Sequence, residues 1–291
     1  MKLLTMIESL LIEGGNAFDG VNSVVPSKHL SSTIENALSM SGLGGIRYSV
    51  IGNYKKPLLG DIDIAVSAVD VGKSINSPND ADFWSNLASF FSKNSKQEFK
   101  INKGLQQAHL LAPLVDKKGK HLDMVSSVGE VGNESGYVQI DIMIGDLEFM
   151  EKSLSTSGDG SKYKAVYRNL LLADIFSQVI FKTSDPEIRR KFQMNWKKGV
   201  EVVDFKTQGN KKKKVRVKMA FNSMDGLAGF LFGEEHTFDD IDSFEKLYGL
   251  MMSSSFMYRK FNDKIFDAYK KTLPRFGLDV PAELANKETP Q

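Results

Sequence analysis

The sequence predicts an α+β fold, with a strand-containing N-terminal domain and a mainly helical C-terminal domain that carries a β-ribbon. Short runs rich in β-branched residues predict strands in the first half. Apolar residues at helical spacing dominate the second half. Between them, residues 153–164 form a polar stretch of small residues, which is typical of a domain boundary. We therefore expect a first domain over residues 1–150 and a second over residues 151–291.

Length and composition are ordinary for a soluble globular protein. The 291 residues are 41% hydrophobic and 25% charged, and the net charge is only +2, so any basic surface must be local. Cysteine is absent, which excludes disulfides and cysteine-based zinc sites. No apolar run approaches the ~20 residues of a membrane-spanning helix. Glu8 and Glu13 interrupt the N-terminal apolar segment, so we expect no signal peptide, no membrane partner and a cytoplasmic location.

The elements of the first domain follow from apolar periodicity and from the turn residues between them. The expected helices are residues 3–11, 31–40 and 81–91. The expected strands are residues 48–51, 62–66, 99–101, 108–112, 122–125 and 137–144. Gly14-Gly15 should end the first helix, and Asn79-Asp80 should cap the third. A glycine-rich connection joins the last two strands, so we expect those two strands to be neighbours.

The second domain is expected to begin with a long helix over residues 163–181, whose apolar residues form one stripe. Residues 199–205 and 215–219 have strand character and flank a turn that contains the four lysines 211–214. This pattern predicts a β-ribbon with a basic tip. The remaining helices are expected at residues 238–257 and 257–273.

Three aspartates stand out against their apolar surroundings. Asp61 and Asp63 are two positions apart, so on a strand both side chains project from one face. Adjacent carboxylates repel each other unless a cation lies between them. Asp141 interrupts the apolar run 137–144, where an unpaired carboxylate is costly. Asp123 is a rival third carboxylate because it also lies in a strand-like run, but Asp141 has the more apolar flanks. Three such carboxylates suffice to hold two Mg²⁺ ions, which can clamp both oxygens of an in-line phosphoryl displacement.

A glycine-containing turn and the three aspartates follow one another in an order that is typical of a known enzyme family. A short strand ends at Gly52-Asn53, a loop leads to Asp61-Ile62-Asp63, and Ile140-Asp141-Ile142 follows later. Residues 48–144 thereby resemble the nucleotidyltransferase superfamily, which includes DNA polymerase beta, poly(A) polymerases and CCA-adding enzymes. That family has a Gly-Gly or Gly-Ser turn, a hydrophobic-flanked Asp-x-Asp or Asp-x-Glu, and a later hydrophobic-flanked Asp. Asn53 departs from the pattern, because Ser or Gly is usual there.

The resemblance implies a nucleotidyltransferase-like mixed sheet with flanking helices in the first domain. It also implies an enzyme that moves a nucleoside monophosphate from a nucleoside triphosphate, with ATP the expected donor, to an acceptor hydroxyl, with release of pyrophosphate. Asp61 and Asp63 would hold both Mg²⁺ (or Mn²⁺) ions. Asp141 would bind the catalytic ion and help to take the proton of the attacking hydroxyl. Gly52 and Asn53 would let the backbone approach the β- and γ-phosphates.

Basic and hydroxyl groups near the start of the 163–181 helix are candidates for binding the triphosphate. Helix N-termini favour anions, and the resembled enzymes often use such groups after the third carboxylate. The candidates are Ser161, Lys162, Lys164 and Arg168. The expected acceptor is an RNA 3′ end, because the lysines 211–214 and the size of the second domain favour RNA.

Other interpretations of the sequence stay open. The acceptor can be a small molecule or a protein, since enzymes with this motif use both. Asn53 also permits a non-catalytic nucleotide-binding or RNA-binding protein with a degenerate site, and the Asp-x-Asp pattern can be a simple loop in a structural protein. The histidines lack paired metal-ligand spacing, so each is expected to be structural. They are His29, His109, His121 and His236.

Overall fold

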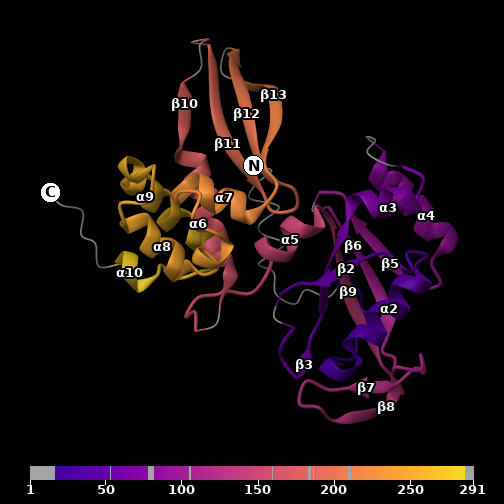
Figure 1. Cartoon of the computed structure of the whole chain (residues 1–291). Helices are drawn as coiled ribbons and strands as arrows, with labels where there is room; N and C mark the ends of the chain where they lie inside the picture. Colours follow the sequence, from indigo (N-terminus) through magenta and orange to yellow (C-terminus); the bar gives the residue numbers. More distant parts are fainter. Residues whose placement is uncertain are drawn as a thin grey trace. The chain divides into compact units, whose positions relative to one another are not determined.

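The computed structural model describes residues 17–52, 54–77, 82–104, 106–158, 160–182, 185, 187–208 and 211–285 (Figure 1). The expected helix over residues 3–11, Asn53 and the expected cap Asn79-Asp80 lie outside the described residues. The chain divides into two compact units, Met1–Glu151 and Lys152–Gln291. This division lies one residue after the boundary expected between residues 150 and 151.

A five-stranded mixed sheet forms the centre of the N-terminal unit. Its strands lie in the order β2-β4-β9-β6-β5. They are β2 (Tyr48–Val50), β4 (Ile62–Ser67), β9 (Tyr137–Gly145), β6 (Gln107–Pro113) and β5 (Phe99–Asn102). The two strands β4 and β9 are parallel, and the other pairs are antiparallel. The expectation of an α+β fold with a mixed sheet is therefore confirmed.

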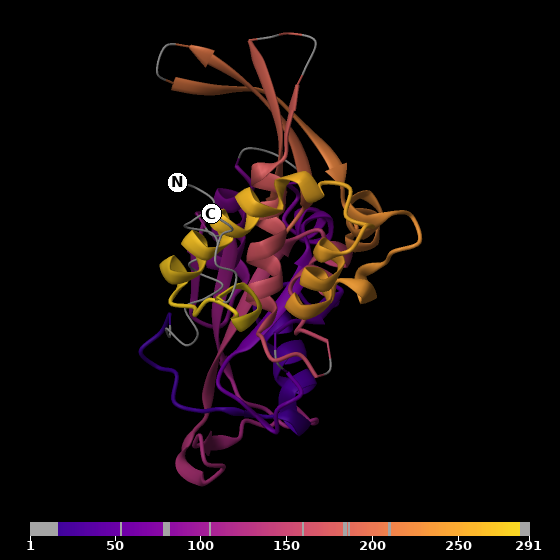
Figure 2. The same cartoon turned by 90° about the vertical axis from the view of Figure 1, so that its left-hand side faces the viewer.

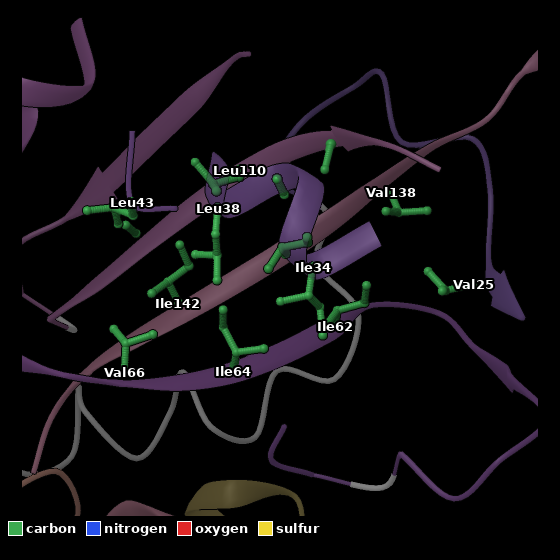
Figure 3. Close-up of a cluster of buried hydrophobic side chains, with 14 of the residues drawn as sticks. Val25, Ile34, Leu38, Leu43, Ile62, Ile64, Val66, Leu110, Val138 and Ile142 are labelled. Atoms are coloured by element: carbon green, nitrogen blue, oxygen red, sulfur yellow. The ribbon is translucent and has the colours of Figure 1, made fainter. Parts of the chain in front are cut away.

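One face of this sheet carries the hydrophobic core of the unit. The helices α2 (Leu30–Met40) and α4 (Phe83–Asn94) contribute to the same core. Figure 3 shows Ile34 and Leu38 of α2 among Ile64 of β4 and Ile142 of β9, all of which are buried. Each such side chain stabilises the fold by roughly 1.5–3 kcal/mol relative to an exposed position. The alternation of these strands therefore places their polar residues on the other face.

Shorter elements complete the N-terminal unit. The helix α3 (Ala68–Ser74) follows β4 in the chain, and α5 (Leu147–Ser153) follows β9 and contains the division between the two units. Two small sheets pair β1 (Val25–Pro26) with β3 (Leu58–Leu59), and β7 (Asp123–Val125) with β8 (Val131–Ser135). The expectation that residues 122–125 and 137–144 are neighbouring strands is wrong, because the intervening glycine-rich segment contains β8, which pairs with β7 instead.

The C-terminal unit contains a larger sheet than the expected β-ribbon. Four antiparallel strands lie in the order β10-β11-β12-β13. They are β10 (Ile180–Lys182), β11 (Ile188–Asn195), β12 (Gly199–Gln208) and β13 (Lys211–Phe221). The expected ribbon is the β12–β13 pair, and β11 extends it because its residues 188–195 pair along nearly the whole of β12. At the base of the sheet Phe192 packs edge-on against Phe176, with ring centroids 5.8 Å apart.

The helices of this unit are shorter than the sequence indicates. They are α6 (Ala165–Gln178), α7 (Met224–Phe232), α8 (Phe244–Met252), α9 (Asn262–Thr272) and α10 (Ala282–Ala285). The expected helix 238–257 is broken because Ser243 caps a new helix by accepting a hydrogen bond from the Lys246 amide, and the chain leaves the helix at Ser253. Among the helices of the described residues, none has the length and apolar character that crossing a membrane requires.

Candidate active site

A row of polar side chains crosses the face of the N-terminal sheet opposite the core. In the register of the sheet, Asp63 of β4 pairs with Asp141 of β9, Asp141 pairs with His109 of β6, and His109 pairs with Lys100 of β5. Residues directly opposite each other on paired strands project from the same face. Two of the three aspartates singled out by the sequence are therefore direct neighbours in space, although 78 positions separate them in the chain.

Asp63 lies in the most strongly perturbed electrostatic environment of this row. Burial, together with the negative charges of Asp61 and Asp141, raises the pKa of its carboxyl group from 3.8 to about 8. A carboxylate that is buried beside two other acids is costly to ionise, and a bound cation removes this cost. The electrostatics thus couple all three aspartates in one acidic site.

Gly52 brings the backbone beside the acidic site. Its φ of +73° is a left-handed conformation that glycine adopts without strain. A Cβ atom at this position would lie 3.5 Å from Oδ2 of Asp63, and the preceding Ile51 amide donates to the Asp63 carbonyl at 3.0 Å. The backbone at Gly52, two residues after the end of β2, therefore lies beside the Asp63 carboxylate.

Two donors hold the Asp141 carboxylate in place. His109 Nδ1 lies 2.7 Å from Asp141 Oδ1, and Gln139 Nε2 donates to the same oxygen at 2.8 Å. Gln139 Oε1 in turn accepts from the Ala17 amide at 2.5 Å. Carboxylates that bind metals are commonly oriented by such hydrogen bonds. The expectation that His109 is merely structural missed this contact, because only the strand register brings it opposite Asp141.

The chemistry of the three carboxylates fits a hard divalent cation. Oxygen ligands suit Mg²⁺ and Mn²⁺, and Mg²⁺ sites commonly combine one or two carboxylates with substrate phosphates. Within the part of the chain that the structure describes, no three acidic or imidazole side chains already form a metal-binding cluster. For these carboxylates to hold a cation, at least one of Asp61, Asp63 and Asp141 would have to turn towards the others, or a substrate phosphate would have to complete the ligand set.

Asp123, the rival third carboxylate, lies elsewhere. It is exposed, and it belongs to β7, which pairs with β8 in a separate two-stranded sheet. Asp141, by contrast, pairs directly with Asp63. The register of the five-stranded sheet therefore favours Asp141 as the third member of the acidic site.

Arg168, one of the triphosphate candidates, has a different role in the structure. It is fully buried in α6, and its guanidinium group donates to the carbonyls of Ser153 and Asp242 and to the Asn169 side chain. Burial lowers its pKa to about 10, so the group stays protonated at neutral pH. Arg168 thus ties α6 to the segments that surround it and presents no surface to a nucleotide.

The other candidates lie just before α6. Lys162 and Lys164 are exposed, and Lys164 is the N-cap residue of the helix. The Ser161 hydroxyl donates to the Tyr163 carbonyl and to Glu245 Oε2, and the Lys162 amide donates to Glu245 Oε1 at 2.6 Å. Glu245 therefore accepts from the Ser161 hydroxyl and from the Lys162 amide. Lys162 and Lys164 stay triphosphate candidates because both side chains are exposed.

Comparisons with protein-family models and with curated proteins do not assign the chain to a family. No protein-family model matches the chain, and no curated protein matches its sequence.

Proposed function

We propose that the protein is a metal-dependent nucleotidyltransferase that transfers a nucleoside monophosphate from a nucleoside triphosphate, with ATP as the expected donor, to an acceptor hydroxyl. One observation carries the proposal. Asp63 and Asp141 are paired in register on parallel strands, and Asp63 has a pKa raised to about 8 by burial and by Asp61 and Asp141. Such a group favours a bound cation, and phosphoryl transfer is a reaction that a cation held by carboxylates promotes.

Each residue of the acidic site has a proposed task. Asp61, Asp63 and Asp141 would hold Mg²⁺ or Mn²⁺, which when bound supplies positive charge that stabilises the developing charge on the transferred phosphoryl group. Asp141 would also help to accept the proton of the attacking hydroxyl, while His109 and Gln139 fix the orientation of its carboxylate. The new bond forms between the hydroxyl oxygen and the α-phosphorus, and the bond to the β-phosphate oxygen breaks, so pyrophosphate leaves.

The turn at Gly52 supports the same proposal. Its left-handed backbone lies against Asp63 without a side chain of its own. A phosphate chain held by the same cation can therefore approach the backbone closely at this turn. The task proposed for Asn53 is to extend this phosphate contact.

Substitution of the central aspartate tests the proposal. In a pyrophosphate-release assay with Mg²⁺, labelled nucleoside triphosphates and pooled small RNA, Asp63→Ala should lower turnover about 10²- to 10³-fold, the order of magnitude for the loss of a single essential charge-stabilising group. Asp123→Ala is the matched control, because it removes an exposed acid from the same unit and should leave turnover unchanged. Equal activity of the wild type and Asp63→Ala would refute the proposal.

The acceptor is proposed to be an RNA 3′ end. Binding through phosphates releases counterions, so the affinity for such an acceptor should fall steeply as salt is added. Turnover that is insensitive to salt would instead indicate a small-molecule acceptor.

A further inference from the structure

The four-stranded sheet of the C-terminal unit concentrates the positive charge of the protein. Residues 180–221 contain 13 Lys and Arg but only 4 Asp and Glu, whereas the whole chain contains 38 and 36. This segment therefore has a formal net charge of +9, and the rest of the chain has a net charge of −7. A protein that is almost neutral as a whole thus carries one strongly basic element.

Part of this charge is ordered on one face of the sheet. Arg190 of β11, Asp204 of β12 and Arg216 of β13 lie directly opposite one another in the register. Lys218 is two positions beyond Arg216 and projects from the same face, ~7 Å further along the strand. Arg190 donates from Nε and Nη2 to the two carboxylate oxygens of Asp204, at 2.8 and 2.9 Å. This bidentate contact fixes the plane of one guanidinium group.

A half-open hollow of about 270 Å³ lies on this face. Its lining consists of Arg190, Val202, Asp204, Arg216, Lys218 and Met219. The hollow therefore has three cationic side chains and one carboxylate, and Arg190 already neutralises that carboxylate. Guanidinium groups bind phosphates through paired hydrogen bonds, and a lysine adds a point charge. The excess charge and the donor geometry match a phosphate-bearing ligand.

The strand that carries Arg216 and Lys218 is open to a large ligand. β13 is one of the two edge strands of the sheet, and residues 213–219 are all exposed. Figures 1 and 2 both show the sheet extending past the helices of the C-terminal unit. Lysines on an edge strand also discourage pairing with other strands, but that role requires no arginine pair around a hollow. An extended chain can thus lie along this edge and contact several cations in succession.

We propose that the face formed by Arg190, Arg216 and Lys218 binds the phosphate backbone of a polynucleotide. In the proposed nucleotidyl transfer this polynucleotide is the RNA acceptor, and only that identification rests on the proposed function. Binding itself depends on the sheet alone, so it can be measured without a nucleoside triphosphate.

Charge reversal on the exposed strand tests the proposal. The binding of a fluorescein-labelled 20-nucleotide single-stranded RNA to full-length protein is measured by fluorescence anisotropy at several salt concentrations. Arg216→Glu/Lys218→Glu should weaken binding at least tenfold and reduce the salt slope by about 1.4, because two phosphate contacts are lost at ~0.7 each. Lys264→Glu/Lys271→Glu is the matched control, since it reverses the same number of exposed charges on α9 of the same unit. This control should bind within twofold of the wild type.

The outcomes separate this proposal from the proposed function. If Arg216→Glu/Lys218→Glu and Lys264→Glu/Lys271→Glu weakened RNA binding equally, only the net charge of the protein would determine the affinity. That result would overturn the assignment of RNA binding to this face. Failure of the wild type to bind RNA, or equally tight binding of polyglutamate, would also overturn it. DNA of the same sequence should bind with similar affinity because the contacts are to phosphate, and indifference of DNA binding to the Arg216→Glu/Lys218→Glu change would contradict the proposal. RNA binding without nucleotidyl transfer to that RNA would refute RNA as the acceptor and would leave the assignment of this face unchanged.

Discussion

Replacement of Asp63 by asparagine should stabilise the protein in the absence of metal. The Asp63 carboxyl has a pKa of about 8 in the folded protein against 3.8 for the unfolded chain. The folded state therefore binds a proton that the unfolded state releases between these two values. The contribution of the Asp63 carboxyl to the free energy of unfolding is therefore fully present below pH 4 and is lost as the pH rises towards 8. Asparagine does not titrate, so the variant should not show this loss.

The size of the effect follows from the pKa difference. One pKa unit corresponds to about 1.4 kcal/mol, so the difference of about 4 units sets an upper limit of about 4 kcal/mol at pH 7 and about 6 kcal/mol above pH 8. Because water and side-chain relaxation screen part of this cost, we expect Asp63→Asn to gain about 1–4 kcal/mol at pH 7. The gain should vanish near pH 4.

Urea unfolding in the presence of EDTA measures this gain. The protein has one tryptophan in each unit, Trp84 in α4 and the buried Trp196, so a Trp196→Phe background makes fluorescence report on the N-terminal unit. Added Mg²⁺ should then stabilise the protein with Asp63 and leave Asp63→Asn unaffected, since the proposed metal site includes the Asp63 carboxylate. A variant that is equally stable or less stable than the parent at pH 9 without metal would refute the reasoning.

Three further predictions concern single side chains. Arg168→Ala should lower stability by about 3–5 kcal/mol in urea unfolding, because it leaves the Ser153 and Asp242 carbonyls without the guanidinium donors and opens a cavity; an unchanged midpoint would contradict the buried role. Lys162→Ala/Lys164→Ala should raise KM for the nucleoside triphosphate severalfold with little change in melting temperature, and an unchanged KM would remove these lysines from the triphosphate site. His109→Ala should lower kcat about 10- to 100-fold by releasing the Asp141 carboxylate, with partial rescue in His109→Asn; activity equal to that of the wild type would show that the hydrogen bond is dispensable.

The acidic site could be predicted from the sequence because its strands have distinctive patterns. Asp63 and Asp141 each interrupt a run of buried β-branched residues. The energetic cost of burying a carboxylate at these positions can therefore be predicted from the sequence alone. Their direct pairing was not visible, because register between strands 78 positions apart depends on long-range packing. The contact of His109 with Asp141 was missed for the same reason, although a histidine in the apolar run of β6 is a signal in hindsight.

The C-terminal unit was less predictable. The strands β10 and β11 are rich in charged residues, and their sequence has little of the alternation that predicts strands. Pairing of β10 with β11 and of β11 with β12, rather than local propensity, forms them. The sequence predicts a ligand contact for Arg168, because the residue is charged and lies near a helix N-terminus, and this prediction is wrong. Only the tertiary structure shows that neighbouring carbonyls surround it.

The most direct test of the central claim is label transfer from a nucleoside triphosphate in the presence of Mg²⁺. Purified protein is incubated with each labelled triphosphate and pooled small RNA, and pyrophosphate release and label in RNA are followed together. The account predicts pyrophosphate release with label in RNA for the wild type, and neither for Asp61→Ala/Asp63→Ala, with Asp123→Ala unchanged. Absence of pyrophosphate release, together with absence of Mg²⁺-dependent nucleotide binding by the wild type, would contradict the account.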